Sequence, residues 1–131
     1  MAFVRTIQSV LPGFGTPSIV VQRTNVTTNT GNTNVTLPAT GSFSPSAGTG
    51  MIRVKSNVIG VNATCKVALI TATDNTTTVQ LYAGDAAASS AGVGIDEVFE
   101  FVTDLNLTSI TVVVNVATNN CTHDVEFAGN P

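Results

Sequence analysis

The stretch Ser109-Ile110-Thr111-Val112-Val113-Val114-Asn115-Val116-Ala117 decides the fold of this chain. Every second residue from Ile110 to Val116 is a branched apolar residue, and successive side chains of an extended strand point to opposite faces. The stretch therefore predicts a β-strand with one wholly apolar face. Three of the four residues on the other face are small or apolar, so we expect this strand to be covered, or nearly covered, on both sides.

The same alternation recurs along the chain and is interrupted by turn residues. It predicts further short strands over residues 3–8, 18–23, 33–37, 51–58, 65–71, 78–83, 95–102 and 121–127. A bulge or tight turn is expected at residues 60–63, and turns at residues 74–76 and 104–106. Residues 84–94 are expected to form an exposed loop, in which residues 85–91 have room for one helical turn. No helical period occurs. Eight or nine short strands with turn signals between them predict an all-β fold, an antiparallel β-sandwich with the jelly roll as the favoured topology.

The first residues of the chain differ from the rest, because two Pro and two Gly break the segment at residues 11–17. We expect an N-terminal arm with short strands over residues 1–24 and one sandwich domain over residues 25–131. Burying a Phe or Leu side chain is worth roughly 1.5–3 kcal/mol, so we expect the arm to dock on a neighbouring subunit or another partner. The candidate partner-binding residues are Phe3, Arg5, Ile7, Leu11, Phe14 and Val20.

Charge is scarce in this chain. Only 10% of the residues are charged, against about 25% in an average domain. The polar surface must therefore consist mainly of Thr, Asn, Ser and Gly, which favours a protein packed against a partner or against copies of itself. All five basic residues lie between Arg5 and Lys66, and all eight acidic residues lie between Asp74 and Glu126. This asymmetry either serves self-association or docking, or arises by chance.

The same composition excludes two kinds of partner. Five separated cations do not make a basic patch, so we expect no nucleic acid partner. No run approaches the roughly 20 apolar residues of a membrane span, and the first residues do not resemble a signal peptide, so we expect no membrane partner.

Cys121-Thr122-His123-Asp124 is the one candidate catalytic cluster in the sequence, because a thiol beside an imidazole can become a nucleophile. On a strand, however, Cys121 and His123 share a face with Val125 and Phe127, which indicates a buried thiol and a satisfied histidine. Cys65 can pair with Cys121 only if their Cα atoms lie within about 7 Å. With no export signal we expect two free buried thiols.

We expect no metal, no cofactor and no catalytic residue. Two Cys and one His fall short of a structural zinc set. The loop residues Asp74, Asp85 and Asp104 do not form the Asp-x-Asp-x-Asp-Gly pattern of a calcium loop.

In style the whole chain resembles the small β-sandwich head-decoration, or cement, proteins of tailed bacteriophages. The resemblance covers the Pro/Gly-punctuated arm from Met1 to Val21 and the Thr/Asn-rich strands from Met51-Ile52-Arg53-Val54 to Val125-Glu126-Phe127. It implies a structural virion protein on the capsid exterior, made in the host cytoplasm and without catalytic residues. It further implies a homotrimer that bridges neighbouring major capsid proteins and stabilises the head.

Two other classes of protein remain open. One is a phage fibre, spike or tail-associated β-sandwich that binds a cell-surface glycan, which exposed aromatic residues in the loops at one end would favour. The other is a small binding module or an enzyme, with Cys121 and His123 as its candidates.

Overall fold

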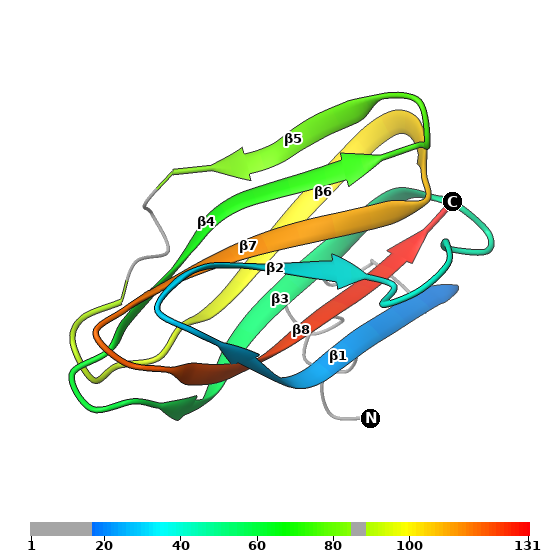
Figure 1. Ribbon diagram of the computed structural model, residues 1–131. Coiled ribbons are helices and arrows are strands. Elements are labelled where there is room, and N and C mark those ends of the chain that lie inside the picture. Colours follow the sequence, from blue (N-terminus) through cyan, green and yellow to red (C-terminus); the bar gives the residue numbers. More distant parts are fainter. Residues whose placement is uncertain (1–16, 85–88) are drawn as a thin grey trace.

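Eight antiparallel strands in two layers make up the part of the chain that the computed structural model describes, residues 17–84 and 89–131 (Figure 1). They are β1 (Ile19–Thr28), β2 (Gly31–Leu37), β3 (Ala47–Ile59), β4 (Thr64–Thr73), β5 (Thr78–Ala83), β6 (Asp96–Leu107), β7 (Ser109–Ala117) and β8 (Cys121–Asn130). One sheet has the order β1-β8-β3-β6 and the other β2-β7-β4-β5. In these two ranges there is no helix with the length and apolar character needed to cross a membrane.

The chain changes sheet at every connection except the one between β4 and β5. This order, with β8 inserted between β1 and β3 and β7 inserted between β2 and β4, is the topology of a jelly roll built from two Greek keys. The all-β sandwich and its jelly-roll topology are therefore confirmed.

Strand β7 lies inside the second sheet, between β2 and β4, and its apolar face forms the centre of the core. Ile110, Val112, Val114 and Val116 are each no more than 1% exposed. The opposite face is less covered than predicted, because Val113 is half-buried. A sandwich has only two layers, so the outward side chains of β7 are flanked by β2 and β4 rather than capped.

Phe127 of β8 fills the middle of the core with its ring. It stacks on Phe43 at a centroid distance of 5.0 Å and on Phe101 at 5.9 Å. Gly50 and Gly129 face each other across β3 and β8. A methyl group on either one would lie 2.3 Å from the Phe127 ring. The two glycines therefore leave a tight slot for this ring, which any larger side chain at either position would fill.

The turns predicted at residues 60–63 and 74–76 are confirmed. Asn62 and Asn75 have positive φ angles of 59° and 77°, which asparagine adopts more readily than most residues. In the second turn, an oxygen of the Asp74 carboxylate accepts the backbone N–H groups of Thr76 and Thr77 at 2.9 and 2.6 Å.

The turn predicted at residues 104–106 is wrong, because these residues continue β6. Exposed Asp104 and Asn106 alternate there with half-buried Leu105 and buried Leu107, so burial of the two leucines outweighs the turn preference of Asp and Asn. β1 is longer than predicted as well. It continues through a bulge between Arg23 and Val26, where Asn25 has a φ of 53°.

Strand β6 forms one edge of its sheet. Half of the eight acidic residues of the chain lie on it, and they are Asp96, Glu97, Glu100 and Asp104.

β1 runs across the predicted boundary between arm and domain, because it pairs with β8 continuously from Ile19 to Arg23 and again from Val26. Residues 1–16 lie outside the described residues. The strand predicted at residues 3–8 and residues 85–88 of the predicted helical turn also lie outside them.

Candidate functional site

Cys65, Cys121 and His123 meet in the core between the two sheets. Cys121 and His123 are on the inner face of β8, Cys65 is on the inner face of β4, and the three are at most 2% exposed. One ligand atom from each residue lies within 4.8 Å of the other two. Both thiols are free, and their Sγ atoms are 3.4 Å apart. The predicted pair of free buried thiols is therefore confirmed.

Ser56 of β3 fixes the imidazole of His123. The Ser56 Oγ lies 3.0 Å from Nδ1 of His123 and accepts the backbone N–H of Ile95 at 2.8 Å. The histidine is buried as predicted but is only half satisfied, because its Nε2 has no hydrogen-bond partner among the described residues. No sequence pattern points to Ser56, because its pairing with His123 depends on the register between β3 and β8.

The electrostatics of this cluster keep His123 and Cys65 neutral at pH 7. Burial lowers the pKa of His123 to about 4, and the charge of Asp124 acts in the opposite direction. Burial raises the pKa of the Cys65 thiol to about 12, and the contact with Cys121 adds to the shift. A thiolate–imidazolium pair, which a cysteine nucleophile requires, is therefore disfavoured at this place.

A second polar group lies on the outer face of the β1-β8-β3-β6 sheet. Arg53 donates from Nε and Nη2 to the two carboxylate oxygens of Asp96, both at 2.7 Å, and this lowers the pKa of Asp96. Glu126, beside Arg53 in the register, is only 4% exposed. Burial raises its pKa to about 7, helped by Asp124 and opposed by Arg53.

The charge asymmetry along the chain is partly explained by this sheet. Strand β3 lies between β6 and β8, so its cations face their acidic residues: Arg53 is opposite Glu126, and Lys55 is opposite both Asp96 and Asp124. Opposite charges in directly paired positions stabilise a sheet. The cations of β3 are therefore placed beside anions of the same molecule.

Three exposed valines gather at one end of the sandwich, and we call Val58, Val61 and Val93 the apolar tip. Their side chains are 61%, 75% and 55% exposed. Val61 is in the β3–β4 turn, and Val93 follows Gly92, whose N–H binds the carbonyl of Ala63 in that turn at 2.8 Å. Val58 is in phase with Ile52 and Val54, and this alternation predicts that it lies on the buried face of β3, but a register shift between Ser56 and Val58 turns it outward.

The candidate partner-binding residues are only partly described. Phe3, Arg5, Ile7, Leu11 and Phe14 lie outside the described residues. Val20 is 43% exposed and lies near the start of β1. At the other end of that strand, its last residue, Thr28, pairs with Cys121. Val20 and the apolar tip are therefore at opposite ends of the sandwich. The remaining large exposed apolar residue in the described ranges is Val102, 85% exposed on β6.

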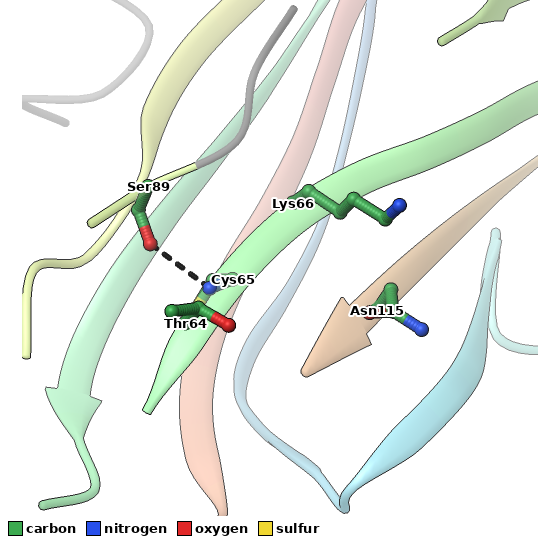
Figure 2. A pocket seen from close by; sticks show the side chains of 5 residues that line it. All are labelled: Thr64, Cys65, Lys66, Ser89 and Asn115. Atoms are coloured by element: carbon green, nitrogen blue, oxygen red, sulfur yellow. Dashed lines mark hydrogen bonds between the residues drawn. The ribbon is translucent and has the colours of Figure 1, made fainter. Parts of the chain in front are cut away.

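Two shallow hollows open on the outer face of the other sheet. The larger, of about 240 Å³, is lined by Thr64, Cys65, Lys66, Ser89 and Asn115 (Figure 2). The smaller, of about 120 Å³, is lined by Ala72, Ser109 and four threonines. Among the described residues, neither lining includes a carboxylate or a histidine, so these residues do not bring together a general acid and base at either hollow.

These features define the class of the protein: it is a jelly-roll β-sandwich with a buried cluster of two thiols and an imidazole in its core and an exposed apolar tip at one end. No protein family model matches the chain, and no curated protein matches it. Among solved structures, a mitogen derived from Yersinia pseudotuberculosis is similar at 9% identity over 86% of both chains, with a TM-score of 0.49.

Viral capsid proteins are also among the structural neighbours. The VP2 subviral particle of infectious bursal disease virus is 14% identical, with a TM-score of 0.44, and the match covers 85% of this chain and 33% of VP2. A pentameric capsid protein from metagenomic phage sequences is 12% identical over 97% of this chain and 89% of its own, with a TM-score of 0.29. At these values the comparisons carry no function to this chain.

Proposed function

We propose that this chain is a structural virion protein, a capsid decoration or cement protein that bridges major capsid subunits and stabilises a bacteriophage head. The observation that supports it most is the apolar tip, exposed on a sandwich with only 13 charged residues among 131. Gathered exposed apolar side chains indicate a surface that another protein covers.

The proposed mechanism uses the sandwich as a rigid spacer with a contact at each end. The apolar tip packs against one capsid subunit. The arm, with Phe3, Arg5, Ile7, Leu11, Phe14 and Val20, docks on a neighbouring copy or on a second capsid subunit, and can add a strand to a sheet edge. Three copies in a homotrimer multiply these modest contacts into a tight attachment.

The alternative, a fibre, spike or tail-associated sandwich that binds a glycan, has less support. A sugar site uses exposed aromatic rings as platforms. Within residues 17–84 and 89–131, Phe43 and Phe127 are buried. Tyr82 and Phe99 are half-buried and pack on each other at a centroid distance of 4.6 Å.

Co-sedimentation with empty capsids of the parent phage tests the proposal. We expect the full chain to bind, and deletion of residues 1–17 to weaken binding at least about tenfold, or 1.4 kcal/mol, with little change in the thermal midpoint. Light scattering at micromolar concentration should give the mass of a trimer.

Two substitutions separate the contribution of the tip from that of the arm. Val61→Thr and Val93→Thr keep the shape of the side chain and add a hydroxyl, so they should weaken capsid binding while the fold stays intact. Val102→Thr is the matched control, because Val102 is also exposed but lies on β6. Equal effects of all three substitutions, or no binding by the full chain, would contradict the proposal.

A further inference from the structure

Cys65 and Cys121 connect the two layers of the sandwich at one point. Cys65 belongs to the β2-β7-β4-β5 sheet and Cys121 to the β1-β8-β3-β6 sheet. They are 56 positions apart in the sequence, yet their Sγ atoms are 3.4 Å apart. A disulfide has an S–S bond of about 2.05 Å, so the two sulfurs need to approach each other by about 1.4 Å.

The backbone holds both thiols in place. The Ser89 hydroxyl accepts the N–H of Cys65 at 2.9 Å, and the Ser89 N–H donates to the carbonyl of Cys65 at 2.8 Å. On the other sheet, the Thr28 hydroxyl donates to the carbonyl of Cys121 at 3.1 Å. Because each cysteine is anchored through its main chain, its side chain keeps facing the other sheet.

We propose that Cys65 and Cys121 are a latent cross-link of the sandwich, which a small-molecule disulfide converts from dithiol to disulfide. One cysteine, as its thiolate, attacks the small disulfide, forms a mixed disulfide and releases one small thiol. The second cysteine thiolate attacks the mixed disulfide and releases the second small thiol. The two protons and two electrons lost by the cysteines thus end on the two small thiols, and one S–S bond replaces another.

The cross-link ties the sheets together near the apolar tip, because Cys65 follows the β3–β4 turn and Cys121 pairs with Ile59 at the end of β3. It also closes a long loop that includes the strands between the two cysteines, and the stabilisation from a disulfide grows with loop length in the chain-entropy model. The thiols stay reduced where small thiols are in excess and become oxidised where small disulfides dominate.

The shallow hollow in Figure 2 opens on the outer face of β4, whereas the Cys65 sulfur faces Cys121 on the inner side. Thr64, Lys66, Ser89 and Asn115 surround the backbone of Cys65 there, and the dashed line marks the hydrogen bond from Cys65 to Ser89. The sulfur itself is covered, and the raised pKa of Cys65 keeps little thiolate present. Oxidation is therefore slow in the folded protein and needs a local opening of the sandwich that lets the reagent reach the buried sulfurs.

The experiment uses the full reduced chain, freed of reductant and incubated under native conditions with oxidised glutathione. We expect the intact mass to fall by two hydrogen atoms and a peptide map to contain Cys65 joined to Cys121. The thermal midpoint should rise by roughly 10–15 °C and return when dithiothreitol is added. Cys65→Ala and Cys121→Ala are the control variants, and neither should show an oxidant-dependent rise.

Three results would overturn the proposal: thiols that stay reduced, glutathione adducts or chain-to-chain disulfides in place of the internal one, and a cross-link that leaves the midpoint unchanged.

Zinc(II) without oxidant forms a separate arm of the experiment, because His123 is a third donor in the cluster. Protection of both thiols from alkylation by zinc, together with no cross-linking by glutathione, would assign a metal site instead. Should a control variant fail to fold, the mass, the linked peptide and the reversal in the wild-type protein still decide the matter.

Discussion

The unfolding free energy should be nearly independent of pH between 4.5 and 6.5 because two buried groups oppose each other. His123 has its pKa lowered to about 4, so the unfolded chain binds its proton first and stability falls as the pH drops from 6.5 towards 4. Glu126 has its pKa raised to about 7, so the folded chain keeps its proton and stability falls as the pH rises from 4.5 towards 7. The two slopes have opposite signs over the same range.

Each group alone changes the unfolding free energy by about 2 kcal/mol between pH 4.5 and 6.5, since one pKa unit corresponds to about 1.4 kcal/mol. Glu126→Gln removes one slope, so this variant should lose about 2 kcal/mol as the pH falls across that range. His123→Asn should show the reverse, a loss of similar size as the pH rises. Asp96 does not interfere, because its lowered pKa places its titration below this range.

Urea unfolding followed by circular dichroism at several pH values measures these slopes. Urea is preferable to guanidinium here, because it is uncharged and leaves the electrostatics unscreened. Substitution of either buried residue also shifts the absolute stability, so the slope with pH is the quantity to compare. A wild-type protein that itself changes by about 2 kcal/mol, or a Glu126→Gln variant as flat as the wild type, would refute the reasoning.

Two further predictions concern the centre of the core. Phe127→Ala should lower the unfolding free energy by about 4 kcal/mol, because the ring is fully buried between Phe43 and Phe101, and the thermal midpoint should fall by roughly 15 °C. A fall of less than about 5 °C in calorimetry would show that the site collapses around the lost ring. Gly50→Ala should cost about 1–3 kcal/mol in urea unfolding, since the added methyl meets the Phe127 ring at 2.3 Å, and a neutral effect would contradict the tight slot.

Local alternation was sufficient to predict the strands whose pattern is simple. In β7 the buried face from Ile110 to Val116 follows directly from its sequence, and β5 has the predicted bounds Thr78–Ala83. The turn at Asp74 was equally readable, because an Asp side chain that accepts nearby N–H groups is a local device. These features depend on neighbours in the sequence and need no knowledge of the fold.

The features that could not be predicted from the sequence depend on contacts between strands. The outward turn of Val58 follows from a bulge opposite β8, and the continuation of β6 through Asp104 follows from burial of Leu105 and Leu107. The contact between Cys65 and Cys121 requires two sheets to meet, which no local pattern specifies. The candidate site was therefore predictable in its residue types and burial but not in its geometry.

The acidic edge strand β6 has a consequence for how copies of this molecule approach one another. An exposed edge offers unpaired backbone groups to any other strand, and natural proteins guard against this with charge. Two β6 strands brought together would place Asp96, Glu97, Glu100 and Asp104 of one copy against the same carboxylates of the other. That repulsion works against an endless ribbon of sandwiches joined through β6, and it favours the other surfaces for any contact between copies.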